Sequence, residues 1–359
     1  MSQVAVPPNL ARGLRTADFD YELPTDLIAQ EPLPRRDDSR LLVLDRSSGA
    51  IHHSTFKRLG DWLRPSDLFV ANNSQVIPAR LRGVRRGTGG AVEVLLLRRG
   101  DDGTWSALAK PAKRLKRGDL VEFAPRAPSA VPATAVVEVN LGDGELLIRF
   151  ADKADERLDA YGELPIPPYI RSFPKDPTRY QTVYAAVPGS AAAPTAGMHF
   201  TPDFIADLRQ RGFDWAEVTL HVGLDTFRPV TMDSVSDHPI HREWCEVPAT
   251  TGEAIASCRV RGSRVVAVGT TVARTLETLG ERWRDEDPSS FMGFTNTFIV
   301  PGHRWKLVDA LLTNFHLPRS TLLMLVSALA GKEAILEAYA EAVRNRYRFF
   351  SFGDAMLIR

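Results

Sequence analysis

The feature that most constrains the fold is a change of pattern along the chain. Between residues 75 and 152, short β-type runs at 91–97, 119–123 and 145–150 follow one another without any helical period. Glycine-containing turns separate them, at Gly89-Gly90, Asp102-Gly103 and Gly142-Asp143-Gly144. Evenly spaced short strands with such turns predict a small β-barrel in this stretch.

The remainder of the chain alternates strands with helices. Thr201 and Pro202 supply an N-cap and a first-position proline for a helix that Gly212 ends. Further strands are expected at 218–222, 263–269 and 355–358, and further helices from 270 to 279, 306–310, 320–330 and 332–345. The sequence therefore predicts an α/β main domain of residues 1–74 and 153–359, with a β-barrel domain of residues 75–152 inserted into it.

Charge is balanced overall but locally uneven. The formal net charge is +1, from 45 basic and 44 acidic residues, which excludes a whole-chain polycation. From Arg80 to Arg117, eleven basic residues face three acidic ones, a local net of +8. The densest group is a solvated loop face or a track for a nucleic-acid backbone, and it consists of Lys110, Lys113, Arg114, Lys116 and Arg117.

Compartment and cofactor signals are sparse. The two cysteines, Cys245 and Cys258, have no C-x-x-C spacing, and the first residues contain no secretory apolar region. The longest apolar stretch, 320–330, is too short to span a bilayer. We therefore expect a soluble cytoplasmic protein. His238, His241 and Glu243 resemble a metal site only superficially, so no metal is predicted.

The segment from Pro194 to Phe200 is the best candidate for a site. A tight Pro/Gly turn places Thr195 and His199 directly before a capped helix, whose free N–H groups suit a polar or anionic ligand. His199 is either a general base or a structural histidine in a turn. His221 lies in a predicted strand, and Asp225 and Thr226 follow it at the strand end where α/β proteins commonly bind ligands.

Other polar residues next to apolar runs are weaker candidates. Thr270 and Thr271 follow a strand and a glycine, so the backbone there is suited to a carboxylate or phosphate. Side-chain amides at a chain crossing commonly satisfy backbone groups, and a structural role remains open for these positions. The remaining candidates of this kind are Asn72, Asn73, Arg80, Tyr169, Arg171, Asn314 and His316.

Taken together, these segments resemble the S-adenosylmethionine:tRNA ribosyltransferase-isomerases of queuosine biosynthesis. The resemblance extends from about Asp18 to the C-terminus. It is carried by ordered blocks, namely FDYELP at 19–24, NN at 72–73 with VIPARL at 76–81, LPIPPYI at 164–170, YQTVY at 180–184, APTAGMHF at 193–200, TLHVG at 219–223, VDALLTNFHLP at 308–318, STLLMLVS at 320–327 and YRFFSFGDAM at 347–356.

The resemblance implies a two-domain fold and a reaction without a metal or redox cofactor. In the reaction it implies, the ribosyl part of S-adenosylmethionine, the co-substrate, moves to 7-aminomethyl-7-deazaguanine at the tRNA wobble position. The products are epoxyqueuosine in tRNA, adenine and methionine. The resemblance also makes a monomer the expected state.

On this resemblance we expect His199 or His221 to be the base that removes a proton beside the sulfonium, with Asp225 as its proton-handling partner. The basic residues Lys110, Lys113, Arg114, Lys116 and Arg117 are expected to contact tRNA phosphates. Substrate binding is expected to involve Asn72, Asn73, Arg80, Tyr169, Arg171, Thr195, Thr226, Thr270, Thr271, Asn314 and His316.

Three turns depart from the family pattern. Ser74 and Gln75 stand where a cation is common, Leu224-Asp225 replace the middle of a Gly-x-Gly-Thr-Phe loop, and Val272 replaces a serine. Two alternatives therefore stay open at this point. One is a paralogue that uses S-adenosylmethionine on another acceptor, and the other is a non-catalytic RNA-binding protein on the same scaffold.

Overall fold

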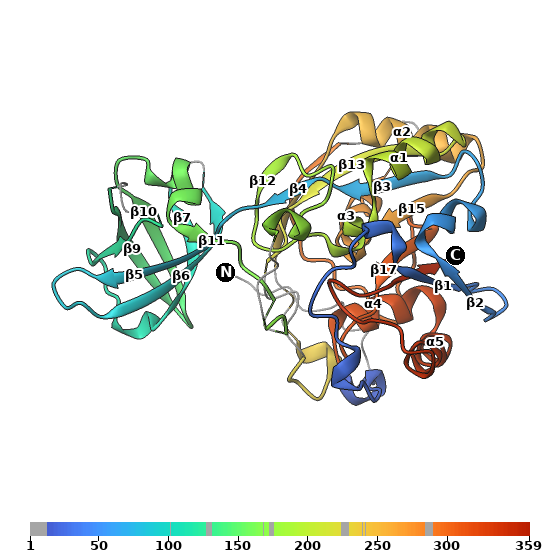
Figure 1. Ribbon diagram of the computed structural model, residues 1–359, viewed down its shortest axis with the longest axis horizontal. Coiled ribbons are helices and arrows are strands. Elements are labelled where there is room, and N and C mark those ends of the chain that lie inside the picture. Colours follow the sequence, from blue (N-terminus) through green and yellow to red (C-terminus); the bar gives the residue numbers. More distant parts are fainter. Residues whose placement is uncertain are drawn as a thin grey trace. The chain divides into compact units, whose positions relative to one another are not determined.

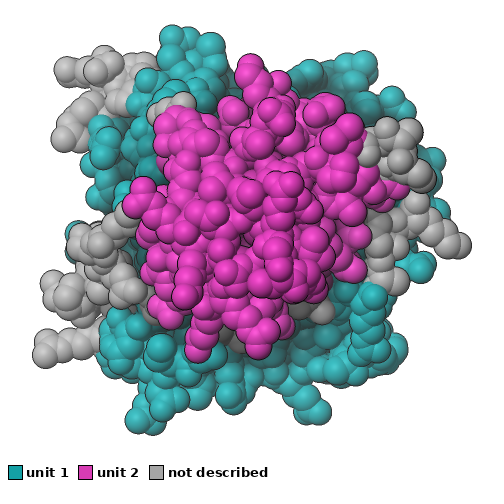
Figure 2. Space-filling view, turned by 90° about the vertical axis from the view of Figure 1, so that its left-hand side faces the viewer, with its two compact units in different colours: residues 1–74, 168–186, 193–359 teal, residues 75–167, 187–192 magenta. Residues whose placement is uncertain are grey.

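The computed structural model describes residues 13–100, 102–126, 131–167, 169–171, 176–223, 230–238, 240, 242–283 and 290–359 (Figure 1). The chain divides into two compact units, coloured separately in Figure 2. The larger unit consists of Met1–Ser74, Pro168–Ala186 and Ala193–Arg359, and the barrel unit of Gln75–Pro167 and Val187–Ala192. The barrel unit thus includes residues beyond its last long strand. The domain boundaries at 75 and 152 stay a prediction.

A nine-stranded mixed sheet forms the centre of the larger unit. Four of its strands run parallel: β13 (Asp214–Leu220), β3 (Leu68–Asn72), β15 (Val265–Val268) and β17 (Ala310–Asn314). Antiparallel β14 (Glu243–Val247) and β16 (Phe291–Thr295) extend the β13 side. On the other side follow β18 (Ala355–Ile358), β1 (Arg40–Leu44) and β2 (Ile51–Thr55).

Strand β18 pairs antiparallel with β17 and parallel with β1, so the last strand of the chain lies between an early and a late one. The helices of this unit are α1 (Pro202–Gln210), α2 (Ala249–Val260), α3 (Thr270–Gly280), α4 (Thr321–Ala330) and α5 (Lys332–Arg344). Among the 3-10 helices, η3 (Arg36–Asp38), η4 (Phe56–Trp62), η7 (Pro177–Tyr180) and η8 (Thr195–His199) are used below.

Local sequence accounts for the helix starts. The Thr201 hydroxyl caps α1 by accepting the Phe204 N–H at 3.1 Å, and Ser320 caps α4 by accepting the Leu323 N–H at 3.2 Å. One prediction was wrong: residues 306–310 form no helix, and β17 begins at Ala310. The carboxylate of buried Glu277 accepts the N–H groups of Lys306, Leu307 and Val308, and this contact from α3 holds the segment as an irregular approach to β17.

A six-stranded antiparallel barrel forms the second unit. Its strands are β5 (Arg80–Arg85), β6 (Ala91–Arg99), β7 (Trp105–Lys110), β10 (Glu145–Phe150), β9 (Ala133–Gly142) and β8 (Leu120–Phe123), and β8 pairs with β5 to close it. Short β11 (Gly162–Glu163) joins β5, and β4 (Ser74–Val76) pairs with β12 (Val187–Ser190). Alternate residues fill the interior, including Val94, Leu96, Phe123, Val137, Leu146 and Ile148. The fold class predicted from the sequence is confirmed.

The parallel strands bring their carboxyl ends to one edge of the large sheet. Asn72, His221, Gly269 and Asn314 all lie at or directly after such an end. Ligands of α/β sheets bind at this edge, because the strand ends and the helix starts that follow them leave a crevice. Within the described part of the chain, no helix is long and apolar enough to cross a bilayer.

Candidate functional site

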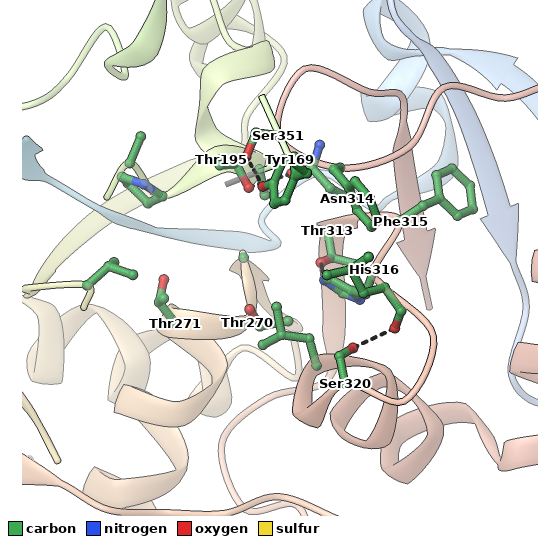
Figure 3. A pocket seen from close by; sticks show the side chains of 18 residues that line it. Tyr169, Thr195, Thr270, Thr271, Thr313, Asn314, Phe315, His316, Ser320 and Ser351 are labelled. Atoms are coloured by element: carbon green, nitrogen blue, oxygen red, sulfur yellow. Dashed lines mark hydrogen bonds between the residues drawn. The ribbon is translucent and has the colours of Figure 1, made fainter. Parts of the chain in front are cut away.

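A pocket of about 650 Å³ lies at this sheet edge, entirely within the larger unit (Figure 3). In Figure 3, Thr270 and Thr271 reach it from the start of α3, facing Thr195, Tyr169 and Ser351. This volume includes space that is open to solvent. Six of the residues predicted to bind substrate line it: Tyr169, Thr195, Thr270, Thr271, Asn314 and His316.

His199 is buried behind this pocket and has partners on both ring nitrogens. Its Nδ1 lies 2.8 Å from the Ser39 hydroxyl and its Nε2 lies 3.0 Å from the Asn314 amide nitrogen. The same amide nitrogen faces the Asp354 carbonyl oxygen, which only accepts, so the amide donates to both and Nε2 is the unprotonated nitrogen. The ring proton is therefore on Nδ1, directed at Ser39. Burial lowers the pKa of His199 to about 4, so the ring is neutral at pH 7.

Thr195 completes this chain of hydrogen bonds. Its hydroxyl donates to the Asn314 carbonyl oxygen at 2.9 Å, which leaves the Thr195 oxygen as an acceptor toward the pocket. The hydrogen bonds run from Ser39 through His199 and Asn314 to Thr195, so a buried histidine fixes the orientation of a pocket amide. The ring of His199 also stacks on Phe56, with centroids 5.1 Å apart.

His316 supports Thr313, which precedes Asn314 in strand β17. Its Nε2 lies 3.0 Å from the Thr313 hydroxyl and its Nδ1 lies 3.1 Å from the Tyr339 hydroxyl. Burial lowers its pKa to about 3. Thr313 and Asn314 are therefore each held by a neutral histidine, and both line the pocket.

The start of α3 contributes the most anion-compatible part of the pocket. Gly269 has φ +97°, a conformation that places Thr270 and Thr271 in the first helical turn without a side-chain cap. Within the described residues, the buried hydroxyl of Thr271 has no hydrogen-bond partner. An orphaned hydroxyl beside uncapped helical N–H groups is suited to a carboxylate.

A buried ion pair holds the chain at the edge of this region. Arg274 of α3 pairs with Glu243, and Glu243 accepts the Gly223 N–H at 3.0 Å. Gly223 directly precedes residues 224–229, which the structure does not describe, so the predicted residues Asp225 and Thr226 lie outside the described residues, as does His241. Val272, one of the departures from the family pattern, is fully buried in α3, and Gln75 is exposed in β4.

His221 differs from His199 in its partners. Its ring stacks on Trp244 with centroids 5.2 Å apart, and among the described residues its buried Nδ1 has no hydrogen-bond partner. Burial lowers its pKa to about 4. The next residue, Val222, lines the pocket.

Four other predicted residues lie apart from the pocket lining. The Asn72 amide is bonded to the backbone of Leu220 and Ser74, and Asn73 is bonded to Glu217 and Thr219, so both fasten a chain crossing. Arg171 is exposed and its N–H donates to Gln30. Arg80 belongs to the barrel unit, 3.8 Å from Glu93. Their assignment to substrate stays a prediction.

The barrel separates its cations into two groups. Arginines on or beside its strands are paired with carboxylates, as Arg85 is with Asp119, Arg86 with Glu122 and Arg99 with Asp155. Within the described residues, none of the five cations predicted to meet tRNA forms an ion pair; these are Lys110, Lys113, Arg114, Lys116 and Arg117. Unpaired cations gathered in one segment form a suitable contact for phosphates.

Sequence reasoning missed several residues that shape the pocket. Ser39 bonds His199 from 160 positions away, and no local pattern links the two. Tyr339 supports His316 from α5, and Ser351 bonds the Tyr169 hydroxyl at 2.6 Å. Of these missed residues, only Thr313 could have been found from the sequence, since it directly precedes Asn314 in the same motif. No group of three His, Cys, Asp or Glu that could hold a metal occurs in the described ranges.

Fold and site together define an α/β protein with a pocket at the carboxyl ends of parallel strands, and with a β-barrel unit whose 110–117 segment holds five cations that form no ion pair among the described residues. A family model described as queuosine biosynthesis protein matches residues 16–358. Among curated relatives, an S-adenosylmethionine:tRNA ribosyltransferase-isomerase from Moorella thermoacetica is 50% identical, and one from Carboxydothermus hydrogenoformans is 49% identical. Each comparison covers 96% of this chain and 100% of the relative.

A solved structure agrees with these relatives. The crystal structure of S-adenosylmethionine tRNA ribosyltransferase from Thermotoga maritima is 41% identical, with a TM-score of 0.55, over 95% of this chain and 100% of that one. The chain belongs to the S-adenosylmethionine:tRNA ribosyltransferase-isomerase family of queuosine biosynthesis. The resemblance and the enzyme class predicted from the sequence are confirmed.

Proposed function

We propose that this enzyme transfers the ribosyl part of S-adenosylmethionine to 7-aminomethyl-7-deazaguanine at the wobble position of tRNA, giving epoxyqueuosine, adenine and methionine. The observation that carries the proposal is the pocket at the sheet edge, because the polar side chains of Thr195, Thr270, Thr271 and Asn314 line one cavity there. Family membership over nearly the whole chain supports the same reaction.

The start of α3 is the proposed seat of the methionine carboxylate. Uncapped N–H groups and the orphaned Thr271 hydroxyl supply donors there, and the helix dipole favours a negative charge. Asn314 and Thr195 then face the ribose, with the Thr195 oxygen accepting a hydrogen bond from a ribose hydroxyl. The apolar residues Val222, Phe315, Leu317 and Leu322 cover the remaining walls.

The chemistry requires a base beside the sulfonium. Removal of a C5′ proton gives an ylide, adenine leaves after gaining a proton, the acceptor amine attacks, and the epoxide closes as methionine departs. Of the two histidines predicted for the base, His221 is better supported, because both nitrogens of His199 are already bonded to Ser39 and Asn314. A base with a pKa near 4 is weak, so His221 needs a carboxylate that raises its pKa, and Asp225 is the predicted partner.

The barrel unit is the proposed tRNA-binding part, through Lys110, Lys113, Arg114, Lys116 and Arg117. Residues 75–152 are proposed as a separate domain of this enzyme. We also propose a cytoplasmic monomer, since the substrate is tRNA and both cysteines, Cys245 and Cys258, are free and buried. Light scattering at the concentration of the assay tests the monomer.

The test is one incubation with S-adenosylmethionine and tRNA carrying the 7-aminomethyl-7-deazaguanine base. Adenine release is followed by chromatography and the tRNA nucleosides by mass. Equal amounts of adenine and epoxyqueuosine are expected, and tRNA with guanine at the wobble position is the matched control. Adenine release without a modified nucleoside would assign the enzyme to another acceptor. Binding of tRNA without adenine release would leave only a binding scaffold.

A further inference from the structure

A second pocket, of about 310 Å³, lies beside η8 in the larger unit. Two arginines contribute to its wall, Arg36 from η3 and Arg179 from η7. Ser39, His199 and Ser351 line it as well. Ser351 also lines the main pocket, so the two cavities share a wall.

Backbone carbonyls hold both guanidinium groups in place. Arg36 donates to the carbonyl oxygens of Gln181 at 2.6 Å, Thr178 at 2.9 Å and Met198 at 3.2 Å. Arg179 donates to those of Leu33 at 2.6 Å and Pro34 at 3.1 Å. Carbonyl oxygens orient a guanidinium without neutralising its charge.

No carboxylate pairs with either arginine among the described residues. Other arginines of the same unit are neutralised: Arg264 pairs with buried Asp67 at 2.7 Å and Arg40 with Asp354 at 2.9 Å. Burial, followed by the nearby Arg179, lowers the pKa of Arg36, and Asp176 opposes this shift. Asp176 acts on both arginines without forming an ion pair with either in the described residues, so it balances the positive charge of the second pocket only in part.

One donor of the Arg179 side chain also lacks a partner. The Nε of Arg179 is buried and forms no hydrogen bond within the described part of the chain. A buried unsatisfied donor costs about 1–3 kcal/mol unless a ligand or ion satisfies it. A pre-oriented guanidinium binds oxyanions, because its N–H groups match two oxygen atoms of a phosphate or carboxylate.

We propose that the Arg36–Arg179 pocket binds a backbone phosphate of tRNA next to the nucleotide that is modified. The proposal rests on the proposed function, since the base of that nucleotide must reach the main pocket. A nucleotide entering one cavity carries a phosphate on each side, and the second cavity adjoins the first across Ser351. The methionine carboxylate of S-adenosylmethionine is proposed to bind at the start of α3, so it does not account for the second pocket.

The test compares Arg179→Met with Arg346→Met. Methionine keeps much of the side-chain length without the charge. Arg346 is exposed and pairs with Asp26 at 2.7 Å in the same unit, so it is the matched control. We expect Arg179→Met to raise the KM for tRNA roughly tenfold, since a charge-assisted hydrogen bond is lost, and to leave the KM for S-adenosylmethionine unchanged. The slope of log Kd for tRNA against log salt should fall by about one.

Arg179→Met also removes the hydrogen bonds to the Leu33 and Pro34 carbonyl oxygens, so a second measurement separates this structural effect from loss of the anion site. Inorganic sulfate should compete with tRNA for the wild type, and the competition should weaken in Arg179→Lys, which keeps the charge but not the two-pronged geometry. An unchanged KM for tRNA in a folded Arg179→Met variant would overturn the site. A raised KM for S-adenosylmethionine alone would assign the pocket to the carboxylate and overturn the phosphate. Turnover by the wild type in the same assay tests the proposed function separately.

Discussion

The amide nitrogen of Asn314 donates to Nε2 of His199 at 3.0 Å, so a residue of the pocket wall takes its orientation from a histidine that lies behind it. This relationship reverses the simplest interpretation of His199. A histidine in a turn before a helix is suggestive of a catalytic base, but here the lone pair that a base would use is already occupied. We therefore propose that His199 acts as a positioning residue through Asn314.

The first prediction concerns Ser39. Ser39→Ala removes the acceptor of the His199 Nδ1–H and leaves a buried donor unsatisfied, which should lower the free energy of unfolding by about 1–3 kcal/mol. Freed from Ser39, the ring no longer fixes Asn314, so the KM for S-adenosylmethionine should rise. Urea unfolding and initial rates measure both. Ser48→Ala, in an exposed turn, is the control and should change neither. Equal behaviour of the two variants would mean that Ser39 does not orient the ring.

The second prediction is a pH dependence of stability. His199 and His316 have pKa values of about 4 and 3 in the folded protein, against an ordinary value of 6.5. The unfolded chain therefore takes up protons first, and stability present above pH 6.5 is lost as the pH falls toward 4. Between pH 7.5 and pH 5, each of the two histidines should lower the free energy of unfolding by about 2 kcal/mol. Denaturant midpoints across this range measure the loss.

Two variants locate that pH effect. His199→Asn should flatten part of the dependence, whereas His52→Asn, at an exposed histidine, should leave it in place. A stability that stays constant from pH 7.5 to 5 in the wild type would show that these buried rings accept protons without cost.

The third prediction concerns the buried pair of Glu243 and Arg274. Glu243→Gln leaves the Arg274 charge without its carboxylate partner and should destabilise the protein by about 3–5 kcal/mol. The same change weakens the bond to the Gly223 N–H, so turnover should fall with stability. Glu246→Gln, on the same strand, is the control for thermal unfolding. A combined Glu243→Gln and Arg274→Met variant that is as unstable as Glu243→Gln would argue against an uncompensated charge as the cause.

The fourth prediction concerns Gly197 in η8. A Cβ at this position would come 1.9 Å from the Tyr184 hydroxyl oxygen and 2.9 Å from Thr182 Cγ2. Gly197→Ala must therefore displace η8, which carries both Thr195 and His199, and we expect a loss of more than about 2 kcal/mol of stability with little remaining turnover. Gly90→Ala, where a Cβ has ordinary space, should be nearly neutral in the same assays. Wild-type kinetics from Gly197→Ala would refute a fixed η8.

The fifth prediction separates the two groups of barrel cations. Arg114→Gln removes a cation without an ion-pair partner in the described residues, so tRNA affinity should fall several-fold and the salt slope by about one. Arg86→Gln removes a cation that pairs with Glu122 at 3.1 Å and should have a smaller effect. Filter binding at several salt concentrations measures both. A larger loss from Arg86→Gln would place the RNA contact on the strands instead of the 110–117 segment.

Much of the fold could be predicted because its signals are local. Glycine turns between short strands mark the barrel, and the strand–glycine–threonine pattern places Thr270 and Thr271 at the start of α3. The helix expected at 306–310 was wrong because the Glu277 carboxylate, a residue of α3, holds the N–H groups of this segment, and no local pattern shows such a contact. Local patterns also placed Tyr169, Thr195, Asn314 and His316 among site candidates, and the fold brings these side chains to one pocket.

The supporting contacts were beyond prediction for a physical reason. Ser39 and His199 meet through packing of η3 against η8, and a sequence shows such a contact only once the whole sheet is assembled. The two arginines of the second pocket are 143 positions apart. The sequence around each one predicts only an ordinary surface cation. The 224–229 loop, with Asp225 and Thr226, remains a prediction from the sequence.

The place of β18 has a consequence for how the protein is made. Strand β1 leaves the ribosome early, yet its parallel partner is Ala355–Ile358, roughly 300 residues later. At about 5–20 residues per second, β1 waits on the order of 15–60 s for that partner. During this time Leu41, Leu42, Val43 and Leu44, all buried in the finished protein, have an unpaired edge. The large sheet can therefore be completed only after the last strand of the chain has been synthesised.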